Sequence, residues 1–290
     1  MAILTLMAID IFSKKRYMIG AVVLLLLVAA TAFLLSSKSK NGQNPVFPFA
    51  PPAQSPSART GGSAYPADVL DLSHWKLTLP ATSPENSSKP LDIFQPELAT
   101  YEMTPWFRLA SDKKGVVFRA PVNAPTTANS DYPRTELREM TADGENEAAW
   151  PSISGTHTLF LDQAITAVPK NKPDVVAGQI HGDDDDLIVI RLEEKKLFVA
   201  RSRANLATLD ENYTLGKRFT IKFVARDGEI AVYYNGGVAP VYTLEKEVNE
   251  AYFKAGVYTQ SNCETEESSD LCAENNYGEV VIYKMNVTHE

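Results

Sequence analysis

The stretch YPRTELREM, residues 132–140, carries a charge at every second position of its centre. If this stretch forms a β-strand, Arg134, Glu136 and Arg138 stand in a row on one face, because successive side chains of a strand point to opposite faces. The threonine and the leucine between them then face the other way. A row of charges on a strand indicates either a solvated outer face or the wall of a polar groove.

Two later stretches repeat this alternation. GQIHG, residues 178–182, places Gln179 and His181 on one face of a strand. YFKAGVYTQ, residues 252–260, places a second polar set on one face, and its members are Lys254, Tyr258 and Gln260. The opposite face of each stretch is largely small or apolar, which is typical of strands that cover a core with one side.

Most of the sequence after Tyr65 has the character of short β-strands. The clearest strand candidates are HWKLTLP (74–80), GVVFRAPV (115–122) and EVVIYKMNV (279–287). Two further segments have the character of β-hairpins, one turning at residues 193–196 and the other at residues 226–228. Long helical periodicity is absent, and short turns of helix are expected only at residues 96–101 and 161–168.

Many short strands in about 226 residues predict an all-β fold, a β-jelly roll sandwich of two antiparallel sheets. The apolar strand faces would meet in the core, and the polar faces would line a concave groove on one sheet. The predicted lining residues are Arg134, Glu136, Arg138, Gln179, His181, Lys254, Tyr258 and Gln260. Three independent solvated strand faces remain the alternative interpretation.

The charge distribution limits the kind of ligand. After residue 64 the chain has 35 acidic and 22 basic side chains, which argues against general nucleic-acid binding because that needs a basic surface. The predicted groove is locally basic on this acidic domain. Cations that face inward on an acidic protein suit an extended anionic ligand.

The N-terminal 65 residues differ from the rest. Residues 18–35 form an uncharged, almost wholly apolar run behind Lys14, Lys15 and Arg16, so residues 1–35 are expected to be a signal peptide or a membrane anchor. Residues 36–65 are rich in Pro, Ser and Gly and are interpreted as a linker. Residues 66–290 would then be one domain outside the cytoplasm, either secreted or held at the membrane by residues 18–35.

Cys263 and Cys272 are the only cysteines. In an exported protein a pair this close in sequence is expected to form a disulfide, although two unpaired thiols are the alternative. No metal site is expected, since two cysteines alone make a poor one and the acidic run at 183–186 is interpreted as a solvated loop.

The three polar stretches also carry a resemblance. RTELR, QIH and YFKAGVYTQ resemble three characteristic segments of the alginate lyases of polysaccharide lyase family 7, in the family's order, and HWKLTLP is similar to the family's first strand. The resemblance spans residues 68–290. It implies a β-jelly roll with a substrate groove on one sheet, which agrees with the fold predicted from the strand pattern.

The resemblance further implies β-elimination on alginate, a 1,4-linked anionic polysaccharide of mannuronate and guluronate, without a cofactor and by a monomer. Arg134, Gln179 and His181 would neutralise or hydrogen-bond the substrate carboxylate, Tyr258 would protonate the leaving oxygen, and His181 would be the base for guluronate. Isoleucine in the middle of QIH goes with guluronate-containing blocks in this family.

Four further residues complete the predicted site. Arg138, Lys254 and Gln260 are assigned to substrate binding, and Glu136 is grouped with them as the residue that orients the neighbouring arginines.

Other functions need other residues. A lyase acting on another polyuronate such as glucuronan would keep Tyr258 and His181, and a non-catalytic carbohydrate-binding jelly roll would need neither. A glycoside hydrolase needs two carboxylates on either side of the scissile bond, and Glu136 and Glu139 lie on opposite faces of the predicted strand.

Overall fold

The computed structural model describes residues 64–86, 89–182, 185–202 and 204–290. The predicted N-terminal segment 1–35 and the linker up to residue 63 lie outside the described residues. Among the residues described, no helix has the length and apolar character needed to cross a membrane.

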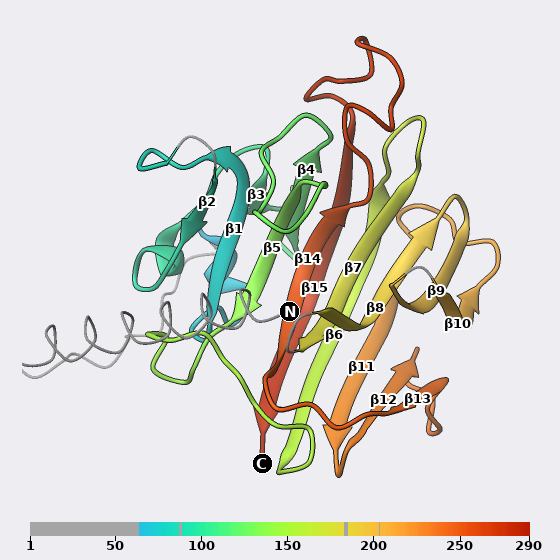
Figure 1. Ribbon diagram of the computed structural model, residues 1–290. Coiled ribbons are helices and arrows are strands. Elements are labelled where there is room, and N and C mark those ends of the chain that lie inside the picture. Colours follow the sequence, from blue (N-terminus) through green and yellow to red (C-terminus); the bar gives the residue numbers. More distant parts are fainter. Residues whose placement is uncertain (1–63, 87–88, 183–184, 203) are drawn as a thin grey trace, which may run out of the picture. The chain divides into compact units, whose positions relative to one another are not determined.

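The described chain is built from two antiparallel sheets (Figure 1). The first sheet has eight strands in the order β10-β9-β8-β7-β14-β5-β1-β2. Its strands are β1 (Trp75–Thr82), β2 (Pro90–Ile93), β5 (Arg134–Glu139), β7 (Asp174–Gly182), β8 (Asp185–Glu193), β9 (Lys196–Arg201), β10 (Ala204–Asp210) and β14 (Ala251–Thr259).

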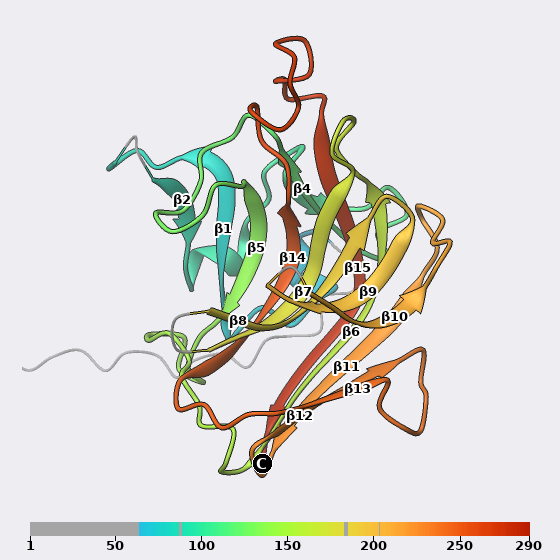
Figure 2. The ribbon, with the colours of Figure 1, turned by 45° about the vertical axis from the view of Figure 1, so that its right-hand side comes forward.

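The second sheet has seven strands in the order β13-β12-β11-β6-β15-β4-β3. Its strands are β3 (Phe107–Leu109), β4 (Val116–Pro121), β6 (Thr156–Ala167), β11 (Phe219–Arg226), β12 (Glu229–Tyr234), β13 (Tyr242–Glu245) and β15 (Tyr277–His289). Two short 3-10 helices, η1 (Pro66–Asp68) and η2 (Glu97–Thr100), complete the described elements. The rotated view in Figure 2 shows the strands of both sheets twisting as they pass each other. The predicted jelly roll is confirmed.

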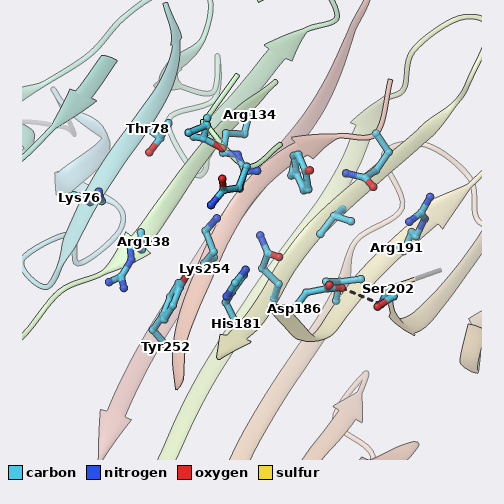
Figure 3. A pocket seen from close by; sticks show the side chains of 18 of the residues that line it. Lys76, Thr78, Arg134, Arg138, His181, Asp186, Arg191, Ser202, Tyr252 and Lys254 are labelled. Atoms are coloured by element: carbon cyan, nitrogen blue, oxygen red, sulfur yellow. Dashed lines mark hydrogen bonds between the residues drawn. The ribbon is translucent and has the colours of Figure 1, made fainter. Parts of the chain in front are cut away.

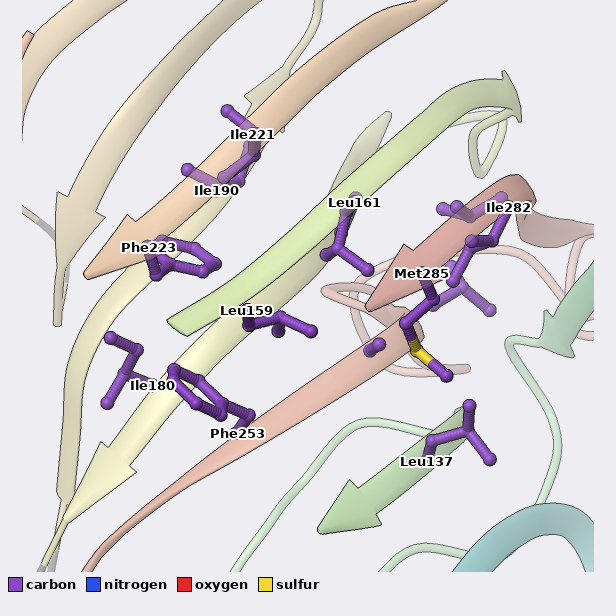
Figure 4. Close-up of a cluster of buried hydrophobic side chains, with 14 of the residues drawn as sticks. Leu137, Leu159, Leu161, Ile180, Ile190, Ile221, Phe223, Phe253, Ile282 and Met285 are labelled. Carbon is purple, nitrogen blue, oxygen red and sulfur yellow. The ribbon is translucent and has the colours of Figure 1, made fainter. Parts of the chain in front are cut away.

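The hydrophobic core fills the space between the sheets. Leu137 of β5, Ile180 of β7 and Phe253 of β14 face Leu161 of β6 and Phe223 of β11, and all five are fully buried (Figure 4). Burying a side chain of this size stabilises the fold by about 1.5–3 kcal/mol. The alternation read from the sequence is therefore the alternation between the core and the opposite face of the first sheet.

Both predicted hairpins are present. β8 and β9 pair across residues 194–195, and β11 pairs with β12 across Asp227-Gly228. Asp227 and Gly228 have φ angles of 52° and 79°, as a two-residue turn that continues the strand twist requires. The predicted disulfide Cys263–Cys272 is also formed, in the loop between β14 and β15.

One predicted element is wrong. Residues 161–168 were expected to contain a turn of helix, and the structure places residues 161–167 in the long strand β6. Gln163 is polar but faces inward, so it interrupts the apolar alternation of the strand. Its side-chain amide donates to the Ala177 carbonyl oxygen at 2.9 Å, which lets it lie in the core. The pairing register of β15 with β6 also shifts beside Ile165, so Ala164 and Ile165 are both buried and the spacing imitates a helix. The other predicted turn, at 96–101, is confirmed as η2.

A buried carboxylate joins β5 to the neighbouring elements. Glu139 is 1% exposed and accepts hydrogen bonds from Trp150 Nε1 at 2.9 Å and from the Phe253 backbone N–H at 2.9 Å. His289 Nε2 lies 2.5 Å from its other oxygen. The end of β5 is thus fixed to β14 in its own sheet and to β15 in the other sheet. Glu139 faces away from Glu136, as the strand alternation predicted.

Candidate active site

β14 lies between β5 and β7, and this register brings the three polar stretches together. Lys254 lies opposite Arg138 on one side and Gln179 on the other, and Tyr258 lies opposite Arg134. One strand row further along, Tyr252 lies opposite His181. Polar side chains from three distant parts of the sequence therefore become direct neighbours on the face of the sheet that points away from the core.

These side chains line a groove of about 650 Å³ that crosses the first sheet from β1 to β8 (Figure 3). Of the eight predicted residues, seven line it directly, and they are Arg134, Arg138, Gln179, His181, Lys254, Tyr258 and Gln260. Glu136, the eighth, is 1% exposed and lies beneath the others. The structure thus brings all eight together.

Glu136 holds the floor of the groove. Its carboxylate accepts Lys254 Nζ at 2.6 Å, Arg134 Nη1 at 3.0 Å and Gln179 Nε2 at 2.5 Å. Three groups from three adjacent strands are therefore oriented by one buried anion. This is the orienting function assigned to Glu136, here extended from the arginines to the lysine and the glutamine.

The charges of this cluster determine how its members ionise. Burial, the largest influence, pushes the pKa of Glu136 upward, but Lys254 and Arg134 together outweigh it and leave that pKa below its ordinary value. Burial, followed by the positive charge of Arg134, lowers the pKa of the Lys254 ammonium to about 8, although Glu136 acts in the opposite direction. Lysine is the cation that releases its proton most easily here, because burial and the positive charge of the neighbouring arginine both favour its neutral form.

The ring of Tyr258 is held between a cation and apolar side chains. The Arg134 guanidinium carbon lies 4.0 Å from the ring centroid, and the ring packs against a small cluster that includes Val176 and Val189. The Tyr258 hydroxyl lies 2.8 Å from Ser130 Oγ. The ring is fixed while its hydroxyl borders the groove, as an acid or base that meets a ligand requires.

His181 lies at the other side of the cluster. Its ring stacks on the Tyr252 ring with centroids 5.1 Å apart and an interplanar angle of 17°. The Arg138 guanidinium carbon in turn lies 3.8 Å from the centroid of the Tyr252 ring. The imidazole is therefore oriented by packing.

Arg134 and Gln260 each carry a buried donor beside the groove that makes no hydrogen bond to the described residues. Arg134 Nε and Gln260 Nε2 are both inaccessible to solvent and make no hydrogen bond there. Buried polar groups are paired in most proteins, so donors left over beside a groove suit an anionic or hydroxyl-rich ligand. No group of three or more His, Cys, Asp or Glu side chains that would hold a metal ion occurs within the described ranges.

Comparison with known proteins identifies the family. The family model described as alginate lyase matches residues 70–289, which is the whole of the described sandwich apart from its first residues and its last. The chain belongs to the alginate lyase family.

Individual members of the family agree with this assignment. The alginate lyase AlgAT5 of polysaccharide lyase family 7 is 49% identical, with a TM-score of 0.72, over 79% of this chain and 100% of that one. The alginate lyase from Corynebacterium sp. is 44% identical, with a TM-score of 0.73, over 78% of this chain and 98% of that one. An alginate lyase of Klebsiella pneumoniae is 33% identical over 158 residues, which cover 46% of this chain and half the length of that enzyme.

The groove of this alginate lyase family member contains residues that the sequence analysis missed. Lys76 and Thr78 of β1, Asp186 and Arg191 of β8, and Tyr252 all line it. Tyr252 has the same strand parity as Lys254, and Lys76 lies in the predicted strand HWKLTLP, so the alternation contained a signal for both. Arg191 carried a weaker signal, because the four residues before it in β8, residues 187–190, are apolar on both faces.

Glu147 forms ion pairs with two cations that line the groove. One of its oxygens lies 2.8 Å from Lys76 Nζ and the other 3.2 Å from Arg138 Nη2, and these two cations are direct partners in the pairing of β1 with β5. A carboxylate held between two cations is the arrangement that a uronate carboxylate would take. Glu147 follows β5 in a loop, where no strand period exists to predict it.

Glu147→Gln should therefore free Lys76 and Arg138 for ligand. Because the Glu147 side chain is 53% exposed, the effect is small, and KM for an anionic polysaccharide should fall by roughly twofold to fivefold with kcat unchanged. Steady-state kinetics test this, with the exposed Glu145→Gln in the same loop as the matched control. An unchanged or increased KM would show that Glu147 does not compete with ligand.

The pKa of Lys254 predicts a pH dependence of binding. Because this pKa is lowered to about 8, Lys254 is charged at pH 7 and mostly neutral at pH 9, so its attraction for a substrate carboxylate is lost over that interval. KM should rise by about tenfold between pH 7 and pH 9. Lys254→Met should show the high KM at both pH values. A wild-type KM that is constant from pH 7 to 9 would contradict the assignment.

Proposed function

We propose that this chain cleaves the 1,4-glycosidic bonds of alginate by β-elimination, that it prefers guluronate-containing blocks and that it cuts within the polymer. Elimination breaks the C5–H and C4–O4 bonds and forms a C4=C5 double bond, which leaves a 4,5-unsaturated uronate end. It needs a partner for the substrate carboxylate, a base at C5 and an acid at O4. The observation that carries the proposal is that residues suited to all three tasks meet in one groove.

The carboxylate partners are Arg134 and Gln179. Both are held from below by Glu136 and line the groove, so their remaining guanidinium and amide donors are available to a ligand there. Negative charge that develops on the carboxylate during removal of the C5 proton is stabilised by donors that are already oriented. Arginine supplies a fixed positive fork, and the glutamine amide donates without adding charge.

The proton carriers are His181 and Tyr258. For guluronate, whose C5 proton lies opposite O4, neutral His181 takes this proton and Tyr258 gives its own to O4. The electron pair of the C5–H bond becomes the double bond, and the pair of the C4–O4 bond leaves with the oxygen. For mannuronate, whose C5 proton lies on the same side as O4, Tyr258 both removes the proton and delivers one to O4.

The preference for guluronate and the internal cleavage have weaker supports. Ile180 stands in the middle of QIH and is fully buried behind His181. The groove continues on both sides of the proposed centre, with Lys76 towards β1 and Arg191 towards β8, so a polymer has cations to meet in both directions. We also propose that the domain acts outside the cytoplasm as a monomer, secreted or anchored by residues 18–35.

The test uses residues 64–290 with polyguluronate, polymannuronate and glucuronan, each followed by the ultraviolet absorbance of the unsaturated end. Polyguluronate should give the fastest rise, and Tyr258→Phe should reduce kcat by about 10³-fold because it removes the acid. Tyr233→Phe on β12, in the other sheet, is the matched control and should behave as wild type. A flat trace on both alginate polymers from a folded domain would rule out alginate as substrate.

The remaining outcomes separate the alternatives. A rise on glucuronan alone would move the substrate to another polyuronate. Silence on all three polymers, with retained affinity for alginate, would indicate a non-catalytic binding module. For the mode of cleavage, solution viscosity should fall early relative to the number of double bonds formed; a slow, proportional fall would indicate cleavage from chain ends.

A further inference from the structure

The hydroxyl of Tyr258 has one hydrogen-bond partner that the elimination mechanism above does not use. Ser130 Oγ lies 2.8 Å from it, and Ser130 belongs to the loop that leads into β5. Nothing in the strand pattern marks Ser130, since it lies four residues before Arg134 and outside the alternation. A role of this serine in catalysis rests on the proposed function.

The hydrogen bonds of Ser130 fix its own position. Its hydroxyl oxygen accepts the Tyr132 backbone N–H at 3.2 Å, and its hydroxyl group is within 3.1 Å of the Tyr132 carbonyl oxygen, to which it can donate. The side chain is thus tied to the backbone two residues ahead, a common local arrangement for serine in turns. Its oxygen is held beside Tyr258 before any ligand binds.

The number of available protons determines which hydroxyl donates in the contact between Ser130 and Tyr258. Serine has one O–H donor and two acceptor lone pairs. While Ser130 donates to the Tyr132 carbonyl, its second lone pair accepts the proton of the neutral Tyr258 hydroxyl. When Tyr258 has given its proton away, its oxygen is an acceptor only, and the Ser130 hydroxyl rotates from the Tyr132 carbonyl to donate to it. The Tyr132 N–H bond is unchanged by this rotation.

We propose that Ser130 is a positioning residue for Tyr258. The Ser130 hydroxyl switches from acceptor to donor as Tyr258 passes its proton to the leaving oxygen. When Tyr258 turns its proton from Ser130 towards O4, the Ser130 hydroxyl rotates and begins to donate to the Tyr258 oxygen. After the transfer Ser130 donates to the phenolate, until that oxygen regains a proton from C5 or from solvent. Donation to a developing anion is stronger than donation to a neutral oxygen, so this contact favours the transition state over the ground state.

Charged neighbours alone do not supply this bond. Arg134 stacks on the face of the Tyr258 ring, so it stabilises negative charge without replacing a donor at the hydroxyl oxygen. The other tyrosine near Ser130 cannot take this role, because Lys172 Nζ donates to the Tyr132 hydroxyl at 3.1 Å.

The titratable and charged side chains around Tyr258 come from all neighbouring elements. They are Arg134 and Glu136 of β5, Lys254 of β14, His181 of β7, Arg191 of β8, and Tyr132 and Lys172 of the adjoining loops.

The test compares wild type, Ser130→Ala, Ser130→Thr and Tyr258→Phe on polyguluronate across the pH range. Ser130→Ala should lower kcat by about tenfold to a hundredfold with KM within about twofold. The alkaline limb of the kcat profile should lie at higher pH in Ser130→Ala than in wild type. The reason is that the Tyr258 phenolate has lost the hydrogen bond from the Ser130 hydroxyl. Ser130→Thr keeps the hydroxyl and should restore most of the activity. Ser111→Ala, an exposed serine between β3 and β4 of the other sheet, is the matched control.

The outcomes distinguish this inference from the proposed function. If wild type is active and Tyr258→Phe is not, a kcat of Ser130→Ala within twofold of wild type overturns the inference alone. A reduced kcat with an unmoved alkaline limb and no recovery in Ser130→Thr also overturns it, since that pattern reflects a structural change in the loop. Thermal unfolding of each variant identifies a loss of fold. An inactive wild type removes the proposed function and this inference together.

Discussion

The interaction on which the site depends is the buried carboxylate of Glu136 beneath the groove. It holds Arg134 of its own strand, Lys254 of β14 and Gln179 of β7 at 2.5–3.0 Å, so one anion positions donors from three adjacent strands. Removing one partner of a buried ion pair typically destabilises a protein by about 3–5 kcal/mol. The Glu136 carboxylate also offsets the mutual repulsion of Arg134 and Lys254 at the floor of the groove.

The fold provides the place where this carboxylate can be buried. Gly256 lies opposite Glu136 with a φ angle of +136°, and a Cβ there would meet the Thr135 carbonyl oxygen at 2.4 Å and the Glu136 Cα at 2.9 Å. A side chain at Gly256 would therefore force β14 away from β5. On the other side, the register of β7 against β14 shifts between Val176 and Gln179, which lets both face the groove. Glycine and an irregular strand pairing together set the distances among the polar groups.

Much of this arrangement was predictable from the sequence, and the limits have physical causes. Alternation alone placed Arg134, Gln179 and Tyr258 on strand faces, because a strand with one buried side has a strict period of two. It did not predict Ser130 or Glu147, because loops have no period. It also misread the strand β6, where the amide of an inward glutamine donates to a backbone carbonyl that no local pattern reveals. The strand pattern assigned the three segments to one groove, but it did not predict the order in which their strands pair within the sheet.

Charge placement connects the fold to the proposed chemistry. The groove brings several cations together on an acidic domain. Within the Glu136 cluster the pKa of Lys254 is about 8, so Lys254 loses its positive charge as the pH rises through this value. The most direct test of this account is a double-mutant cycle of Glu136→Gln and Lys254→Met, measured as free energies of unfolding in urea at pH 7. The account predicts that the double variant is more stable than the sum of the two single changes implies, by about 2 kcal/mol. Additivity within about 0.5 kcal/mol would show that Glu136 does not hold Lys254, and would contradict it.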